Sequence, residues 1–255
     1  MNEKIEQKLK QLPDSPGVYM FFSAQKELIY VGKASSLKNR VKSYFIGKKS
    51  PRPIEEMIHK VVDLDTETTD SALEAAILEG FYIKKYRPKY NVQWRDDKSW
   101  NYIGITKDAY PEVITIRQHE LTLEKQKEFK YFFGPYPGLN AKVAMKILRK
   151  LFSFSTCRPG AKRPCFYYQL GECLGVCTGE ISAADYKQKV IRPLVLFLDG
   201  KKKLLIKDIE KEMTLAAKAE NFEEAARLRN QLGHLKKIQD IALLNESFMQ
   251  DKIGT

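Results

Sequence analysis

Hydrophobic and polar residues follow helix and strand periods in turn along the first third of the chain. Residues 1–12 carry apolar side chains at helical spacing, and Pro13 and Pro16 then end this helix and release a strand. Over residues 18–23 the side chains alternate between two faces, and residues 28–32 (LIYVG) give a second strand after a turn. The two strands predict a β-hairpin.

A helix and a third strand are predicted after the hairpin. Residues 33–45 (KASSLKNRVKSYF) have helical spacing, and Ser35 or Ser36 is available as the N-cap. Residues 60–67 (KVVDLDTE) are typical of another strand.

A longer helix is predicted to complete this part of the chain. Residues 71–86 carry apolar side chains at helical intervals, Asp70 can cap the start, and Arg87-Pro88 ends the pattern. We therefore expect residues 1–95 to form one compact domain of mixed helices and strands.

Sequence patterns typical of strands return in the middle of the chain. Between residues 97 and 134 it occurs in three stretches, WNYIGIT, EVITIRQ and KYFFGPY, and residues 141–152 form an amphipathic helical pattern. A further helix after a cysteine-containing segment is interrupted by Pro193. We expect residues 96–202 to form a middle region of strands and helices.

The last element predicted is a helical hairpin over residues 203–239, followed by a tail over 240–255. Apolar residues follow 3-4-3 spacing in the second helix, as at a coiled-coil interface; they are Ala225, Leu228, Leu232 and Leu235. A short hairpin with one apolar stripe on each helix is marginal alone, so we expect it to bury that stripe against another surface.

The charge of the chain indicates a polyanionic partner. The 255 residues include 44 Lys and Arg against 32 Asp and Glu, a formal net charge of +12. Cationic side chains bind nucleic acid largely by releasing counterions from phosphates, although charge alone also allows a merely basic protein. The placement of charge favours nucleic acid, because residues 26–49 hold seven Lys or Arg and only one acid, Glu27.

A second basic cluster, IKKYRPKYNVQWR at 83–95, is interleaved with aromatic residues. This mixture is typical of surfaces that follow phosphates and stack on bases. The candidate DNA contacts from both clusters are Lys38, Lys42, Lys84, Lys85, Arg87, Lys89 and Arg95. The sequence has no run of 18 apolar residues and no apolar signal core, so we expect a cytoplasmic protein without a membrane partner.

All four cysteines lie within 21 residues, in the pattern C-x7-C-x7-C-x3-C; they are Cys157, Cys165, Cys173 and Cys177. Without a secretory signal, such crowding over 157–177 favours a metal centre over disulfides. Four thiolates suit Zn²⁺ or an iron–sulfur cluster, and the spacing matches neither a two-residue zinc-knuckle pattern nor the ferredoxin pattern. The ligand chemistry alone slightly favours Zn²⁺ over an iron–sulfur cluster.

Two tripeptides of the hairpin, GVY at 17–19 and YVG at 30–32, each set a tyrosine beside a valine and a glycine. Tyrosine is common in strands, so either one alone is ordinary. Their neighbours change this interpretation. Lys33 follows the second tripeptide at once, and Arg40 and Tyr44 share a helix face at i and i+4. The set indicates an active site.

These residues resemble a known family. GVY, YVG, the following Lys, Arg and Tyr, and RPKYN at 87–91 look like the GIY-YIG nucleases. The stretches PDSPGVYMF, IYVGKASSLKNRVKSYF and ALEAAILEGFYIKKYRPKYNVQWRDDKSW resemble the N-terminal half of the UvrC excinuclease family more closely, and the resemblance covers residues 10–240. It implies an α+β fold: a small GIY-YIG domain with a central three-stranded antiparallel sheet and flanking helices, then a strand and helix region with the cysteines, then a helical hairpin.

The resemblance also implies roles for individual residues. The matching catalytic positions are Tyr19, Tyr30, Lys33, Arg40, Tyr44 and Asn91, and Glu79 in AILEG matches the metal-binding carboxylate for Mg²⁺ or Mn²⁺. In the family the Tyr30 position is proposed as the general base, with water positioning as the alternative role. A phenol with a pKa of about 10 is a poor base, and we expect Lys33 and the metal to lower that pKa.

For the later regions, the resemblance implies a [4Fe–4S] cluster on the four cysteines rather than zinc, although Val176 stands where the family usually has proline. AENFEEAARLRNQL resembles the UVR motif through which UvrC pairs with UvrB. The residues expected to contact this partner are Phe222, Ala225, Leu228 and Leu232, with Phe222 as a buried anchor at the turn. The alternative is a hairpin that packs on its own protein.

The implied function is the 3′-side incision of damaged double-stranded DNA in nucleotide excision repair. The RNase H-like nuclease of a full UvrC does not match any part of this chain, so we expect either a fragment or a short homologue in the manner of the Cho nucleases, which lack the UVR hairpin. The alternatives are a non-catalytic adaptor that binds DNA and UvrB, and a homing or restriction-type nuclease.

Overall fold

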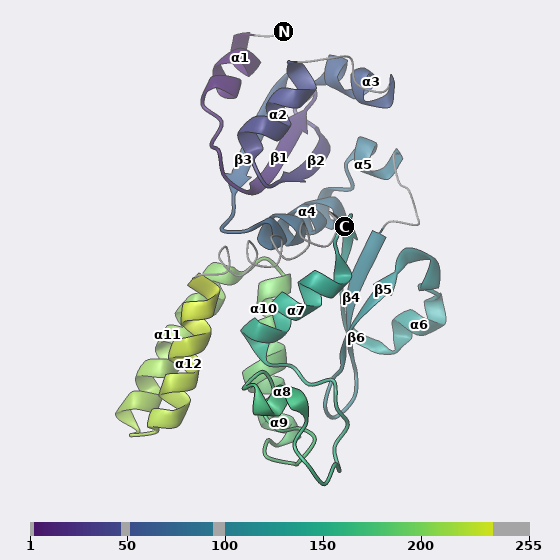
Figure 1. Ribbon diagram of the computed structural model, residues 1–255. Helices are drawn as coiled ribbons and strands as arrows, with labels where there is room; N and C mark the ends of the chain where they lie inside the picture. The colour runs from purple at the N-terminus through teal and green to yellow at the C-terminus, as the bar shows by residue number, and fades with distance from the viewer. Residues whose placement is uncertain (1–2, 47–51, 94–99, 237–255) are drawn as a thin grey trace, which may run out of the picture. The chain divides into compact units, whose positions relative to one another are not determined.

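The computed structural model describes residues 3–46, 52–93 and 100–236. The chain divides into two compact units (Figure 1). The first consists of Met1–Asp97 and Gly134–Pro137, and the second of Lys98–Phe133 and Gly138–Thr255. A four-residue segment from the middle region therefore belongs to the N-terminal unit, which the sequence division at residue 95 did not anticipate.

The first unit contains the expected three-stranded antiparallel sheet, with strand order β2-β1-β3. Helices α2 and α4 pack on its strands, and α1 packs on β3. The elements of this unit are α1 Glu3–Lys10, β1 Gly17–Phe22, β2 Leu28–Ala34, α2 Leu37–Phe45, α3 Arg52–Lys60, β3 Asp63–Thr68, α4 Ala72–Tyr86 and α5 Lys89–Gln93.

The core of this unit forms where the sheet meets the helices. Phe21 of β1, Val41 of α2 and Met57 of α3 are fully buried in one cluster. Burial of each such side chain contributes about 1.5–3 kcal/mol. Because the register pairs Tyr19 of β1 with Gly32 of β2, the two tripeptides lie side by side in the sheet.

The helix ends follow local chemistry, with one difference from the sequence prediction. Ser36 caps α2 and accepts a hydrogen bond from Asn39 N, as expected. Helix α4 is capped by Ser71, not by Asp70: the Ser71 hydroxyl accepts from Glu74 N at 3.1 Å, because Ser71 has the extended backbone of an N-cap.

The second unit contains a sheet of order β5-β4-β6 and a set of helices. The three strands expected between residues 97 and 134 are present, and α7 has the predicted bounds. Pro193 lies near the start of α10, and the π-helical turn Lys187–Ile191 directly before this helix marks the predicted interruption. The last four residues of β6, Gly134–Pro137, belong to the first unit. The elements are β4 Trp100–Thr106, β5 Val113–Arg117, α6 Leu123–Lys127, β6 Phe129–Pro137, α7 Ala141–Phe152, α8 Phe166–Gln169, α9 Ala183–Tyr186, α10 Arg192–Leu198, α11 Lys202–Lys218 and α12 Phe222–Lys236.

Helices α11 and α12 form the predicted hairpin, side by side in Figure 1. Leu228 and Leu232 of α12 are buried, and α12 packs against α11 and α7. Gln231 adds a hydrogen bond from its side-chain amide to the Leu151 carbonyl at 3.2 Å. The chain thus covers its own apolar stripe. None of the helices within the described ranges is long and apolar enough to cross a membrane.

Candidate active site

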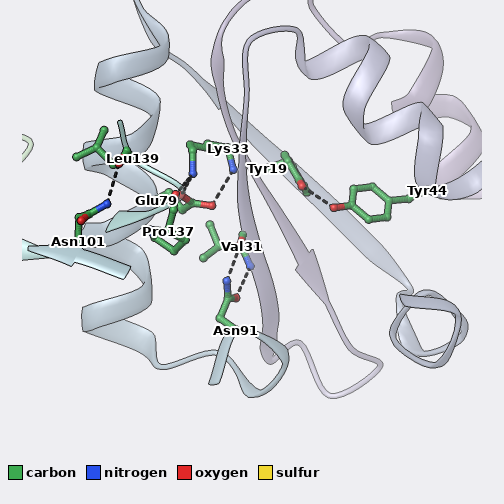
Figure 2. A network of polar contacts seen from close by, with 9 residues as sticks. All are labelled: Tyr19, Val31, Lys33, Tyr44, Glu79, Asn91, Asn101, Pro137 and Leu139. Atoms are coloured by element: carbon green, nitrogen blue, oxygen red, sulfur yellow. Dashed lines mark hydrogen bonds and ion pairs between the residues drawn. The ribbon is translucent and has the colours of Figure 1, made fainter. Parts of the chain in front are cut away.

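Three tyrosines from three elements meet in the first unit: Tyr19 of β1, Tyr30 of β2 and Tyr44 of α2. The ring centres lie 6.1 Å apart for Tyr19 and Tyr30, and 5.7 Å apart for Tyr19 and Tyr44. The hydroxyl oxygens of Tyr19 and Tyr44 are hydrogen-bonded at 2.8 Å (Figure 2). Arg40, one turn before Tyr44, places its guanidinium carbon 4.9 Å from the centre of the Tyr44 ring. Arg40 and Tyr44 therefore share one helix face, as predicted, and this face lies beside the two strand tyrosines.

The glycine of YVG is required by the Tyr19 ring. A Cβ atom on Gly32 would lie 2.4 Å from the Tyr19 hydroxyl oxygen and 2.5 Å from its Cζ, which is closer than real Cβ contacts. Tyr19 is only 1% exposed, so its ring cannot move aside into solvent. Glycine at this position lets the Tyr19 ring lie against β2 and reach Tyr44.

An ion pair joins β2 to α4 beside the tyrosines (Figure 2). Lys33 donates twice to Glu79: from its backbone N to Oε1 at 3.1 Å and from Nζ to Oε2 at 2.8 Å. Glu79 is 5% exposed and is the only buried carboxylate in the part of the chain that the structure describes. Burial raises the pKa of the Glu79 carboxyl above its ordinary value, although the charge of Lys33 opposes this increase.

The donor set fits a cation held by one carboxylate and water. No three His, Cys, Asp or Glu side chains within the described ranges are placed to hold a metal ion together. Mg²⁺ needs only one or two protein carboxylates because it keeps several of its waters. The Lys33 ammonium on Oε2 shows that Glu79 already binds a positive charge at this position.

A residue that sequence reasoning missed also reaches Lys33. Its Nζ donates to the carbonyl oxygen of Pro137, the last residue of β6, in the segment that joins the first unit (Figure 2). In the sequence, this stretch indicates only the end of a strand and a turn. No sequence signal could link Pro137 to Lys33, because the contact is made by a backbone carbonyl.

Asn91 binds the backbone of β2 rather than the carboxylate. Its Oδ1 accepts from Val31 N and its Nδ2 donates to Val31 O, both at 2.8 Å. β2 is at an edge of the sheet, so the amide of Asn91 pairs with it as a neighbouring strand would. The structure therefore places Asn91 against the β2 backbone at Val31, between Tyr30 and Gly32 in the strand.

Burial, and not a neighbouring cation, has the largest effect on the pKa of Tyr30 in this structure. Burial raises the pKa of Tyr30 far above that of a free phenol, and Tyr44 and Glu79 add to the increase. The ammonium of Lys33 is drawn instead to Glu79 and Pro137. Burial likewise raises the pKa of Tyr19, so these phenols are neutral at physiological pH.

The predicted DNA contacts are mostly exposed. Lys42 on α2 is half-buried, and Arg95 lies outside the described residues. Lys85 places its Nζ 4.8 Å from the centre of the Tyr86 ring, so a basic and an aromatic group lie together near the end of α4. The exposed members are Lys38, Lys84, Lys85, Arg87 and Lys89.

The four cysteines are free thiols that influence one another. Burial raises the pKa of Cys157 to about 11, and a hydrogen bond with Cys165 adds to this increase. The backbone also folds the segment together, because Gly160 N and Ala161 N donate to the Cys177 carbonyl at 3.1 and 2.9 Å. The thiols are neighbours, but within the described ranges no three of them have the geometry of a metal site.

The structure corrects one expectation about the hairpin. We expected Phe222 to be a buried anchor, but it is 69% exposed at the first position of α12. Leu228 and Leu232 are buried within the chain and Ala225 is half-buried. This burial is what the alternative of a hairpin packed on its own protein requires.

Three protein-family models match consecutive parts of the chain. The UvrC-like GIY-YIG domain matches residues 15–92, the UvrC/Cho excinuclease middle domain matches 100–194, and the UvrB/UvrC motif matches 203–238.

Curated relatives agree with these models. The chain is 41% identical over 256 residues to the UvrABC system protein C of Desulfitobacterium hafniense, covering 99% of this chain and 41% of that protein. It is 42% identical to the same protein of Carboxydothermus hydrogenoformans, covering 91% of this chain and 38% of that one. The chain therefore spans about two fifths of the length of these relatives.

A solved structure is also similar to the N-terminal region. It is the GIY-YIG N-terminal endonuclease domain of UvrC from Thermotoga maritima, described as bound to its catalytic divalent cation, magnesium. The two chains are 41% identical with a TM-score of 0.33, and the match covers 36% of this chain and 99% of that one. With three UvrC models matched in order and relatives that align along nearly all of its length, the chain belongs to the UvrC family of excinucleases.

Proposed function

We propose that this chain is a Mg²⁺-dependent endonuclease of nucleotide excision repair that cuts damaged double-stranded DNA on the 3′ side of a lesion. We place this activity in the cytoplasm, with UvrB as partner. The observation that carries the proposal is the buried carboxylate of Glu79, bound by Lys33 beside three tyrosines and Arg40. A merely structural carboxylate would rarely be buried so close to this many groups suited to phosphate chemistry.

In the proposed mechanism, fixed positive charge binds the scissile phosphate. Lys33 and Arg40 supply it, and cationic donors aimed at a phosphoryl group stabilise the charge that grows on its oxygens. Glu79 would hold Mg²⁺, which supplies Lewis-acid polarisation of the phosphoryl oxygen and stabilisation of the departing 3′ oxygen. Magnesium suits this site because Glu79 is its one buried carboxylate.

We propose that Tyr30 acts as a neutral phenol that orients the attacking water. Its burial raises its pKa far above physiological pH, so a phenolate is costly to form there. A neutral hydroxyl can accept a hydrogen bond from the attacking water. This bond orients the water so that a lone pair of the water oxygen is directed at phosphorus. The general-base role expected from the resemblance requires that a bound metal lower the pKa that burial raises.

We propose that DNA follows the basic and aromatic side chains near the end of α4. Exposed Lys84, Lys85, Arg87 and Lys89 supply phosphate contacts, and the Tyr86 ring is half-exposed beside Lys85. Such contacts give an affinity that falls steeply with salt.

We propose that UvrB binds the exposed tip of the α11–α12 hairpin rather than its stripe. Phe222 is exposed at the tip, and Leu215 near the end of α11 is 56% exposed. A buried stripe cannot meet a partner without unfolding the hairpin, whereas exposed apolar residues gain from being covered. Phe222→Ala should weaken UvrB binding in a pull-down or titration, and Leu204→Ala, an exposed position at the other end of α11, is the matched control.

The cysteine segment supports a second, separable proposal. It starts from the hydrogen bonds that link the Cys165 side chain to those of Cys157 and Cys177. We propose a [4Fe–4S] cluster, with Zn²⁺ as the alternative. Anaerobic purification should give a brown protein with a broad band near 400 nm, whereas bound zinc without visible absorbance would contradict iron.

The test of the main proposal is nicking of a lesion-containing duplex with Mg²⁺, with and without UvrB. Glu79→Gln keeps the shape of the side chain but removes its charge, and should abolish nicking. Normal nicking by Glu79→Gln would refute the metal assignment. A wild-type chain that binds DNA and UvrB without cutting would instead show an adaptor, and lesion-independent cutting without UvrB would show a stand-alone nuclease.

A further inference from the structure

Residues 134–137, which we call the GPYP segment, lie outside the matched GIY-YIG domain yet belong to the nuclease unit. They fall within the match to the UvrC/Cho middle domain at 100–194. Tyr136 of this segment is 1% exposed, so the segment is packed into the unit and not merely adjacent to it.

The packing of this segment explains a glycine in the middle of α4. A Cβ atom on Gly80 would lie 2.7 Å from the Pro135 carbonyl oxygen and 2.7 Å from Cδ1 of Tyr136. Glycine inside a helix costs about 0.5–1 kcal/mol relative to alanine. The helix carries this cost at the position directly after Glu79, where only glycine leaves room for the segment.

The same segment ends at the proposed site of catalysis. Lys33 Nζ has two acceptors, Glu79 Oε2 and the Pro137 carbonyl oxygen (Figure 2). If Glu79 held a divalent cation, the Lys33 ammonium would be repelled and would lose its acceptor on Glu79. Lys33 then needs another acceptor, and the neutral Pro137 carbonyl is already in contact with it.

We propose that the GPYP segment is a positioning element of the metal site: the Pro137 carbonyl holds the Lys33 ammonium when a divalent cation takes its place on Glu79. The segment thereby lowers the cost of displacing Lys33 and keeps its charge beside the phosphate. This inference rests on the proposed metal site at Glu79. It adds that residues from the middle region tune that site.

The experiment measures Mn²⁺ binding to the full chain by electron paramagnetic resonance, without DNA or turnover. Gly80→Ala should displace the segment and weaken Mn²⁺ binding by about tenfold, because Lys33 is left with Glu79 as its acceptor. Tyr136→Leu, which withdraws the ring from α4, should change the affinity in the same direction. Gly233→Ala, in α12 where a Cβ meets nothing within 4 Å, is the matched control and should leave it unchanged.

A Lys33→Met background separates positioning from general packing. If the segment acts through Lys33, Gly80→Ala has no effect on Mn²⁺ affinity once the ammonium is absent. An equal loss of affinity in both backgrounds, or no loss in the wild-type background, would overturn the inference. Failure of the proposed function gives a different result, since Glu79→Gln would then still bind Mn²⁺.

Discussion

Replacing Gly32 by alanine introduces one methyl group where the Tyr19 ring lies. The new Cβ would be 2.4 Å from the Tyr19 hydroxyl oxygen, 2.5 Å from Cζ and 3.1 Å from Cε1. Those atoms cannot retreat easily, because the Phe21 and Tyr44 rings have their centres 5.3 and 5.7 Å from that of Tyr19. The ring must therefore leave its position.

Two costs follow from this displacement. Overpacking a filled core costs about 1–3 kcal/mol. Loss of the Tyr19–Tyr44 hydrogen bond leaves a buried hydroxyl unpaired, which costs about 1–3 kcal/mol more. Alanine recovers about 0.4–1 kcal/mol by restricting the unfolded chain. We expect Gly32→Ala to lower the free energy of unfolding by about 2–4 kcal/mol.

Urea unfolding followed by near-ultraviolet circular dichroism measures this change, because the signal reports the packed tyrosines. Gly233→Ala is the control, and it should be neutral or stabilising because its Cβ meets nothing within 4 Å. In a Tyr19→Leu background the cost of Gly32→Ala should largely disappear. The reasoning is refuted if the cost is below about 0.5 kcal/mol, the usual range of neutral surface changes, or if it is unchanged in that background.

Three further predictions concern single groups. Asn91→Ala leaves Val31 N and O without their side-chain partner, and should cost about 1–3 kcal/mol in urea unfolding while slowing nicking; an unchanged midpoint would contradict the supporting role. Burial would raise the pKa of Asp63, but Lys4 and Lys8 of α1 outweigh burial and lower that pKa. The ion pairs therefore stabilise the protein above the ordinary Asp pKa of about 4, and this stabilisation is lost as the pH falls through the lowered pKa of Asp63. Asp63→Asn should therefore destabilise the protein by up to about 1 kcal/mol at neutral pH, a difference from wild type that shrinks in acid; a constant difference down to about pH 2 would argue against it. Tyr30→Phe should lower the nicking rate by a similar factor at every pH between about 6 and 9, because the proposed Tyr30 phenol stays neutral over this range. If the wild-type rate instead rises with pH and the rate of the variant does not, the result would favour the general-base role.

The groups that could be predicted from the sequence are those whose chemistry lies in side chains at short spacing. Tyr19 and Tyr30 are set by the hairpin register, and Arg40 and Tyr44 by one helical turn, so the sequence already places each pair correctly. Glu79 came from the resemblance, because an isolated glutamate on a helix has no local signature.

The remaining features depend on contacts between distant segments. The Pro137 contact is made by a backbone atom, and the need for glycine at position 80 appears only when Tyr136 lies against α4. The burial of Leu228 depends on α7, which lies far away in the sequence. Periodicity identifies an apolar face but does not identify what covers it.

The position of β2 at the edge of its sheet has a consequence for self-association. An edge strand offers unpaired N–H and C=O groups that can recruit a strand from another molecule. Helices α4 and α5 pack against β2, and the backbone N–H of Lys33 donates to Glu79 Oε1. By occupying both backbone groups of Val31, the Asn91 amide interrupts the row that another strand would have to match. The side chains of Asn91 and Glu79 thus occupy backbone groups that a strand from another molecule would need for pairing.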